Sequence, residues 1–122
     1  MKRMATEEDR TRKWVEVWKR AGPALEAVLQ TEPTPNGIVF CGDAVDYGPQ
    51  PVECVRWLAR HAQHVVRGNH DNALALDQDC QCQGKFREFS LATRAWHRTL
   101  LRRSELGFLH AMPKLSRFQW DN

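Results

Sequence analysis

The sequence predicts an α/β fold with a partial parallel sheet built on one β-α-β unit. Two observations support this fold class. Short apolar runs at residues 38–40 and 64–68 are typical of strands, and a helical pattern that opens at Pro51 lies between them. Residues 38–67 also have the length of one β-α-β unit, which makes its strands parallel and its crossover right-handed. The 122 residues suit one domain or part of one.

The N-terminal part of the chain is expected to divide into two pieces. Residues 1–22 form a divergent, charged helical segment in which Trp14 and Trp18 stand on one apolar stripe. Gly22 and Pro23 interrupt this stripe. A second helix is expected to begin at Pro23, since proline is favoured in a first turn. We therefore expect the main folded domain to occupy residues 23–122.

The elements after residue 50 follow from periodicity and turn residues. The helix that begins at Pro51 is predicted to bury one face, made of Val52, Val55, Leu58 and Ala59. Beyond the second strand we expect mostly loop over 69–86, a helix over about 90–101, a short helix over 104–112 and a weak strand over 115–120.

Composition and charge exclude several classes of protein. The formal charge is +3 and the pI is about 8.8, a mild basicity that attracts phosphate-bearing partners without identifying one. No apolar run approaches the roughly 18 residues that a membrane span needs, and the N-terminus lacks the apolar region of a signal peptide. We expect a cytoplasmic protein with no membrane partner, whose four cysteines are reduced thiols.

Two polar loops are predicted to meet at one edge of the sheet. Asp43 and Asp46 follow the first strand, and Asn69 and His70 follow the second. Because the carboxyl ends of parallel strands share an edge, these side chains should converge there. Asp43 and Asn69 supply oxygen ligands for a divalent cation, and His70 supplies an acid or base whose ring Asp46 can orient. A cation beside a histidine suits phosphate-ester chemistry.

The motifs "GDAVDYG" and "RGNHD" resemble the calcineurin-like metallophosphoesterase family, and in particular its small bacterial-type metallophosphatases. The similarity covers roughly residues 23–120, with both motifs at the family's separation. It implies a fragment of the family's α/β sandwich. By position, it implies that Asp43 and Asn69 are metal ligands, that His70 protonates the leaving group and that Asp46 orients His70. Tyr47 stands where the protein-phosphatase branch of the family has arginine.

The resemblance also implies a substrate and a cofactor. The substrate would be a phosphomonoester or a phosphodiester, and the metals would be Mn, Fe or Zn, among which these donors do not choose. This sequence contains neither the family's Asp-x-His block nor its closing Gly-His-x-His block. We therefore expect a chain truncated at both ends, with an incomplete metal site and impaired hydrolysis.

Other functions compete with this prediction. A non-catalytic remnant or a partner-dependent binding protein would expose a sheet edge, through which the chain could self-associate. A nucleic-acid-binding module is the third possibility, but we favour a solvated helix face for the basic residues of the C-terminal half. These are Lys85, Arg87, Arg94, Arg98, Arg102 and Arg103.

Single motifs also have plainer interpretations than a catalytic role. Asp43 and Asp46 could simply form a turn, and Asp71 is expected to shape its loop. The spacing of Cys80 and Cys82 could bind a soft metal, although we favour an ordinary loop there.

Overall fold

The computed structural model describes residue 27 and residues 37–119 of the chain. The chain divides into two compact units, Met1–Asn36 and Gly37–Asn122, and every element whose bounds are given below belongs to the second. The expected division after residue 22 and the expected N-terminal helices lie outside the described residues. Within the described part of the chain, no helix combines the length and the apolar character needed to cross a membrane.

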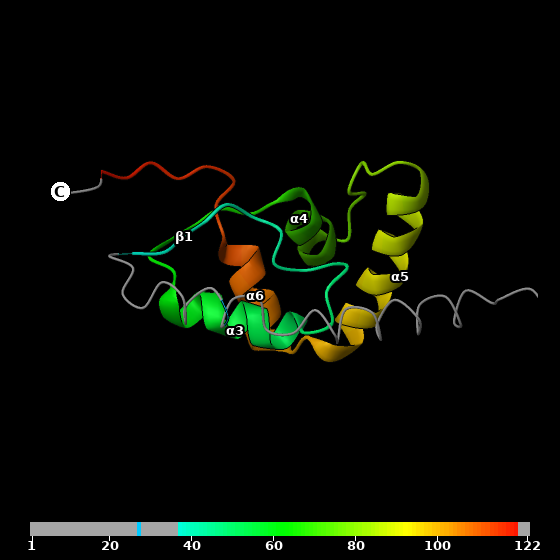
Figure 1. The fold of residues 1–122 in the computed structure, drawn as a ribbon, viewed down its shortest axis with the longest axis horizontal. Coiled ribbons are helices and arrows are strands. Elements are labelled where there is room, and N and C mark those ends of the chain that lie inside the picture. Colours follow the sequence, from blue (N-terminus) through cyan, green and yellow to red (C-terminus); the bar gives the residue numbers. More distant parts are fainter. Residues whose placement is uncertain (1–26, 28–36, 120–122) are drawn as a thin grey trace, which may run out of the picture. The chain divides into compact units, whose positions relative to one another are not determined.

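The predicted β-α-β unit is present. Strand β1 (Val39–Phe40) runs parallel to strand β2 (His64–Val65), and helix α3 (Pro51–His61) connects them (Figure 1). Val39 pairs with His64, and Phe40 pairs with Val65. The prediction of a small parallel sheet is therefore confirmed, although each strand is shorter than predicted. The first strand ends because the chain turns sharply at Gly42, whose φ is +106°.

Helix α3 begins at the predicted residue and buries most of the predicted face. Val55 and Leu58 are 1% and 4% exposed, and Val52 packs at the margin of the core. Ala59, which was predicted to share this face, is exposed. That part of the prediction is wrong because the buried stripe is centred on Pro51, Val55 and Leu58, and Ala59 lies at its edge.

Helix α4 (Asn69–Leu76) occupies a segment that was predicted to be mostly loop. The prediction missed the N-terminal signal of this helix. The Asp71 side chain, in the first turn, accepts the backbone N–H of Gly68 at 3.0 Å, which satisfies a donor that the helix itself leaves free. The helix ends at Asp77, which adopts the left-handed conformation with φ 53°.

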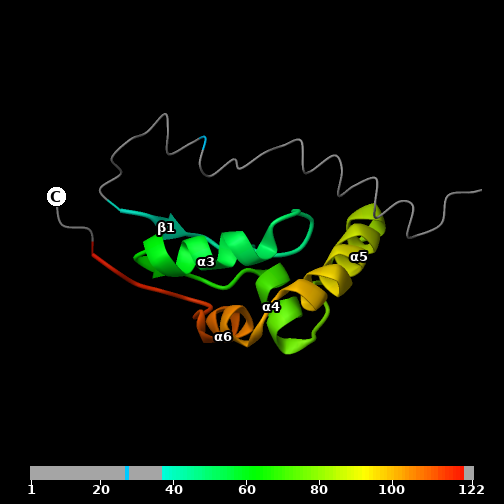
Figure 2. The same cartoon turned by 90° about the horizontal axis from the view of Figure 1, so that it is seen from below.

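Helix α5 (Gly84–Leu100) begins earlier than the predicted residue 90. Its first two turns contain Lys85, Arg87 and Glu88, which favour helix formation and are exposed. Among the elements that the structure describes, α5 is the longest helix, with 17 residues, and α4 lies beside it (Figure 2). Its buried face is polar, and this face contributes to the candidate site described below.

Helix α6 (Arg103–Ala111) fulfils the prediction of a short helix after residue 103 and packs against both α3 and α4 (Figures 1 and 2). The main hydrophobic cluster lies among these three helices, the C-terminal end of α5 and the loop after β1. Its buried members are Val45, Val55, Leu74, Leu101, Leu109 and Met112. Val45 comes from the loop that carries the two aspartates, so this loop is anchored in the core.

An ion pair joins α3 to α6. Nε of Arg56 donates to Oε1 of Glu105 at 2.8 Å, and the backbone N–H of Arg102 donates to the other carboxylate oxygen at 2.7 Å. The hydrogen bond from the Arg56 side chain is the largest cause that lowers the pKa of Glu105 to about 2. Because of this low pKa, the Glu105 carboxylate is ionised at neutral pH, as the ion pair with Arg56 requires.

The segment after α6 was predicted as a weak strand, and this prediction is wrong. Residues 113–119 contain no strand, yet they run alongside β2 in the opposite direction. The backbone N–H of Arg67 donates to the carbonyl oxygen of Pro113 at 2.8 Å, and the rings of His64 and Phe118 stack with centroids 3.9 Å apart. A single backbone hydrogen bond together with a ring contact does not make a ladder.

Candidate active site

The loop after β1 and the loop after β2 meet backbone to backbone. Gly42 and Gly68 allow this approach because neither has a side chain. A Cβ atom at Gly42 would lie 2.8 Å from the Cα atom of Gly68, and one at Gly68 would overlap the carboxylate of Asp43. The approach brings Asp43 and Asp46 together with Asn69 and His70, which lie 23 or more positions away in the sequence.

Asp71 holds the first loop to the start of α4. Its side chain is fully buried, and it accepts the backbone N–H groups of Asp43 and Ala44 at 2.7 Å each and that of Val45 at 3.3 Å. With the bond from Gly68, the carboxylate receives four backbone donors. Burial raises the pKa of Asp71, while these N–H groups act in the opposite direction. Asp71 thus has the loop-shaping position that its place in the sequence suggested.

His70 contacts both aspartates of the first loop. Its backbone N–H donates to Oδ1 of Asp43 at 3.1 Å, and its ring Nδ1 lies 2.8 Å from Oδ2 of Asp46. The ring of Tyr47 meets the His70 ring edge to face, with centroids 4.9 Å apart. Both His70 and Asp46 are buried, so the ring is held in one orientation by contacts on two sides.

The loop that carries Asp46 has an unusual backbone. Asp43, Asp46 and Tyr47 all have positive φ values, between 61° and 69°. Residues other than glycine adopt this conformation only when surrounding contacts enforce it, at a cost of about 1–3 kcal/mol each. The contacts that hold Asp46 and Tyr47 come from helix α5.

Four polar residues of α5 line its buried face and hold the loop. They stand at positions i, i+3, i+4 and i+7 of one helical stripe, namely Ser90, Thr93, Arg94 and His97. Ser90 donates its hydroxyl to Oδ2 of Asp46 at 2.7 Å. The hydroxyl oxygen of Thr93 accepts the backbone N–H of Tyr47 at 2.9 Å.

His97 joins the loop through both ring nitrogens. Nδ1 accepts the backbone N–H of Asp46 at 3.0 Å, and Nε2 donates to the carbonyl oxygen of Gly48 at 2.7 Å. These two bonds require a neutral ring protonated on Nε2. Burial is the main cause that lowers the pKa of His97, which keeps the ring neutral.

Arg94 forms a buried ion pair with Asp46. Nη2 and Nε of Arg94 lie 2.7 Å and 3.2 Å from Oδ2 of Asp46, and both side chains are almost fully buried. The prediction that Arg94 belongs to a solvated basic face is therefore wrong. Oδ2 of Asp46 accepts from His70, Ser90 and Arg94, whereas its Oδ1 is buried and has no hydrogen-bond partner among the described residues.

The two predicted metal ligands lie at the exposed rim of this network. Asp43 and Asn69 are both exposed, unlike Asp46 and His70. Nδ2 of Asn69 donates to the carbonyl oxygen of Cys80 at 3.0 Å, so its Oδ1 is the amide atom available as a ligand. Asp43 uses Oδ1 to accept the N–H of His70, which leaves Oδ2 for a cation. Oxygen atoms of the predicted ligand type thus come from both converging loops.

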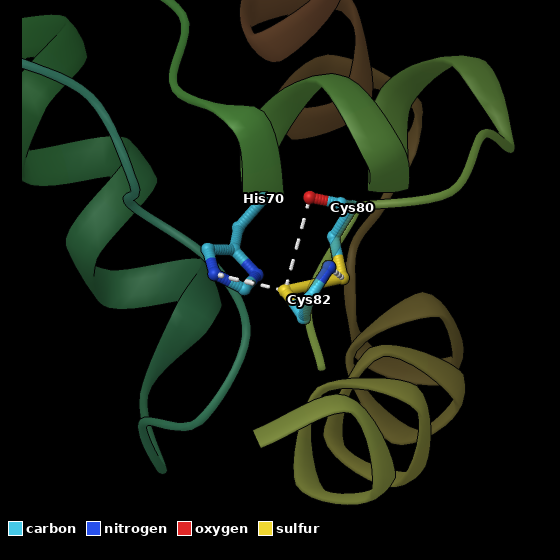
Figure 3. A group of neighbouring side chains, drawn as sticks. All are labelled: His70, Cys80 and Cys82. Carbon is cyan, nitrogen blue, oxygen red and sulfur yellow. Dashed lines mark hydrogen bonds between the residues drawn. A yellow bond between two sulfur atoms is a disulfide. The ribbon is translucent and has the colours of Figure 1, made fainter. Parts of the chain in front are cut away.

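A pair of cysteines lies on the Nε2 side of the His70 ring, opposite the contact with Asp46. Cys80 and Cys82 are joined by a disulfide, so the prediction of reduced thiols is wrong for this pair, while Cys41 and Cys54 are free (Figure 3). Sγ of Cys82 lies 3.7 Å from Nε2 of His70. The loop of residues 77–83 therefore packs against the histidine that the second motif supplies.

Sequence reasoning missed Ser90, Arg94 and His97 as members of the site. The signal that could have found them is their spacing, because polar residues at i, i+4 and i+7 share one helix face. Such a stripe usually faces water, and in this chain the loop after β1 buries it, through Asp46, Tyr47 and Gly48.

Comparison with protein families gave one match. Residues 8–118 match the sequence model of the calcineurin-like phosphoesterase family. Searches of curated proteins and of solved structures gave no match. The family match covers both loops, helix α5 and every residue of the network described above.

Proposed function

Because the chain belongs to the calcineurin-like phosphoesterase family, we propose that its converging loops act in the metal-dependent hydrolysis of a phosphate ester. His70 is the proposed leaving-group acid, Asp46 its positioning residue, and Asp43 and Asn69 the proposed metal ligands. The observation that carries the proposal is the 2.8 Å contact between Nδ1 of His70 and Oδ2 of Asp46. It engages Nδ1, so that Nε2, which lies 3.7 Å from Sγ of Cys82, is the nitrogen that can act on a substrate.

The role of His70 follows from this contact. With Nδ1 bonded to Asp46, Nε2 is the nitrogen that can carry a proton to the departing oxygen of an ester. The ring cannot turn freely, because Tyr47 packs on it and Asp46 is itself held by Arg94 and Ser90. An acid held in one orientation protonates its leaving group without first losing rotational freedom.

Asp43 and Asn69 fit a divalent cation. Both side chains offer oxygen atoms at the exposed rim. Oxygen donors suit Mn²⁺ and other hard or borderline cations, and Fe and Zn²⁺ are alternative metals for this site. A bound cation would polarise the phosphoryl oxygens and lower the pKa of a bound water. Two protein ligands are few, and the sequence contains no Asp-x-His or Gly-His-x-His block. We therefore expect weak metal binding and slow hydrolysis.

An assay with one variant and one control tests this proposal. The full 122-residue chain is incubated with Mn²⁺ and an aryl phosphate monoester or diester, and release of the phenol is followed. His70→Ala should lower kcat by at least about 100-fold, because general acid catalysis contributes on that order. His110→Ala is the control, because its exposed ring lies outside the network. No release above a metal-only blank would reject the proposal.

Exposed apolar side chains favour a second candidate, a binding protein that is completed by a partner or by a second copy of the chain. Phe86 and Leu115 are each 71% exposed, and Val39 on β1 is 42% exposed. Burying such side chains against a partner would stabilise the chain by roughly 1.5–3 kcal/mol for each full burial. Sedimentation that shows concentration-dependent association would support this candidate, whereas a monomer with a sharp unfolding transition would count against it.

A further inference from the structure

We propose that His70, Cys80 and Cys82 form a separate site for a soft divalent cation such as Zn²⁺ when the two cysteines are reduced. Nε2 of His70 and the two sulfur atoms lie within 4.8 Å of one another (Figure 3). One imidazole and two thiolates are ligands that zinc prefers, whereas the rim offers only oxygen. The sulfur-containing site therefore prefers zinc more strongly than the rim, whose oxygen atoms suit Mn²⁺ equally well.

One distance between ligand atoms already suits zinc, and the two sulfurs can move apart once the disulfide is reduced. Zinc bonds to sulfur at about 2.3 Å and to nitrogen at about 2.0 Å, so tetrahedral coordination separates nitrogen from sulfur by about 3.5 Å. Nε2 of His70 and Sγ of Cys82 already lie 3.7 Å apart. The Cα atoms of Cys80 and Cys82 are 5.3 Å apart. The sulfur of Cys82 lies next to the His70 ring, and the sulfur of Cys80 lies next to that of Cys82 (Figure 3).

The surroundings of the three ligands also support a metal site. Asp46 contacts Nδ1 of His70, which is the carboxylate partner that metal-binding histidines commonly have on their second nitrogen. The backbone N–H of Cys82 donates to Sγ of Cys80 at 3.3 Å, and such a donor stabilises a thiolate. Cys80 is 3% exposed and Cys82 is half-buried, so the cation would reach the site from the side of Cys82.

The disulfide and the metal exclude each other, because a sulfur atom in a disulfide is not a thiolate ligand. A dithiol reductant opens the site: its two S–H hydrogens pass to Cys80 and Cys82, the Cys80–Cys82 bond breaks, and the two sulfurs of the reductant join. When the cation binds, both cysteines lose their protons to the solvent. The site thus forms only under reducing conditions.

A metal at this site would stop the chemistry proposed for His70, and this consequence rests on the proposed function. Nε2 of His70 is the atom that would carry the proton to the leaving group, and it is also the atom that faces the sulfurs. One lone pair cannot hold a proton and a metal at the same time. We therefore expect Zn²⁺ to inhibit the reduced protein much more strongly than the oxidised protein, in which the sulfur site is closed.

Cobalt reports this site directly. The full chain is reduced under nitrogen with a phosphine, which binds metals weakly, and is then titrated with Co²⁺. The expected result is one Co²⁺ per chain with a sulfur-to-cobalt charge-transfer band and the intense visible bands of tetrahedral coordination, all displaced by Zn²⁺. The oxidised protein should show no charge-transfer band. The absence of the band in the reduced protein would overturn the proposal.

Variants assign the ligands. Cys80→Ser, Cys82→Ser and His70→Ala should each weaken Co²⁺ binding by about tenfold or more, as loss of metal-site residues does in other proteins. Cys41→Ser and Cys54→Ser are matched controls, because these cysteines are free and lie outside the cluster. A band that survives in Cys80→Ser and Cys82→Ser, or that depends on Cys41, would contradict the assignment.

Two further measurements keep the result independent of folding and of hydrolysis. In the unaltered chain, Zn²⁺ should protect Cys80 and Cys82, but not Cys41, from alkylation mapped by mass spectrometry. Equal labelling with and without Zn²⁺ would refute the site. The inhibitory consequence is tested separately, with Mn²⁺-supported hydrolysis measured before and after Zn²⁺ is added to reduced protein. Absence of any hydrolysis refutes only the proposed function, whereas hydrolysis that zinc leaves unchanged refutes only the inhibition.

Discussion

The Nδ1 atom of His70 lies 2.8 Å from Oδ2 of Asp46, and the same oxygen accepts two bonds from Arg94. The carboxylate that orients the histidine is therefore also one half of a buried ion pair. Removing either charge affects both the fold and the orientation of the ring. Four predictions about the network around this contact can be tested by measuring stability alone.

Removing Arg94 should leave the charge of Asp46 buried and unpaired. We expect Arg94→Met to lower the free energy of unfolding by about 3–5 kcal/mol, the usual result of breaking a buried ion pair. Asp46→Asn in the same chain should recover part of this loss, because the unpaired charge is then gone. Urea unfolding of the two single variants and the double variant measures the coupling. Strictly additive losses would show that the two side chains do not interact.

Asp71 should be among the most sensitive positions outside the hydrophobic core. Asp71→Asn replaces one carboxylate oxygen by an NH₂ group, which turns a donor toward backbone donors of the first loop. Because hydrogen bonds to charged groups contribute about 1.5–3 kcal/mol, we expect a loss of about 2 kcal/mol or more. Asp79→Asn is the control, since its contact with Arg87 is exposed to solvent and should contribute little to stability. Similar losses in both variants would contradict the central role of Asp71.

The close approach of the two loops should make Gly68 intolerant of a side chain. Gly68→Ala places a Cβ atom against the carboxylate of Asp43 and should destabilise the protein by about 1–3 kcal/mol, as overpacking does. Gly48→Ala is a matched control in the same loop system, because a Cβ atom there meets nothing within 4 Å. We expect its effect to stay within about 0.5 kcal/mol. Thermal unfolding of both variants makes the comparison, and equal shifts in Tm would disprove the clash.

Mild acid should weaken the hold of α5 on the first loop. His97 has a lowered pKa in the folded state, so the unfolded chain binds its proton more readily. Stability should therefore fall as the pH drops below 6.5, the ordinary histidine pKa, and should go on falling until the folded-state pKa is passed. His97→Gln does not titrate, and its urea midpoint should depend less on pH between 7.5 and 5. Parallel pH profiles for the two proteins would count against the prediction.

The β-α-β unit and the convergence of the two motifs were predictable because local signals and topology agree. The apolar runs, the proline at position 51 and the length of the crossover fix the unit, and parallel strands then place their loops on one edge. The metal-ligand and acid roles of Asp43, Asn69 and His70 remain predictions. Their positions in the structure are compatible with those roles.

Helix α4 and the polar face of α5 could not be predicted in the same way. The short helix depends on the first-turn carboxylate of Asp71. This carboxylate accepts the N–H of Gly68 and, at the same time, three N–H groups of the first loop, and no periodicity of the sequence reveals these contacts. Arg94 and His97 carry the residue types of a solvated face, and only the path of the first loop across α5 buries them. Similarly, the disulfide between Cys80 and Cys82 could not be told from two free thiols by spacing alone.

Val45 occupies the core while its neighbour Asp46 faces the polar network, so consecutive residues of one short loop point in opposite directions. The length of this loop is therefore constrained. Adding or deleting one residue between Asp43 and Asp46 would turn the charged side chain toward the core and the apolar side chain toward the polar network. Changes in length should be tolerated instead in exposed loop segments outside this alternation.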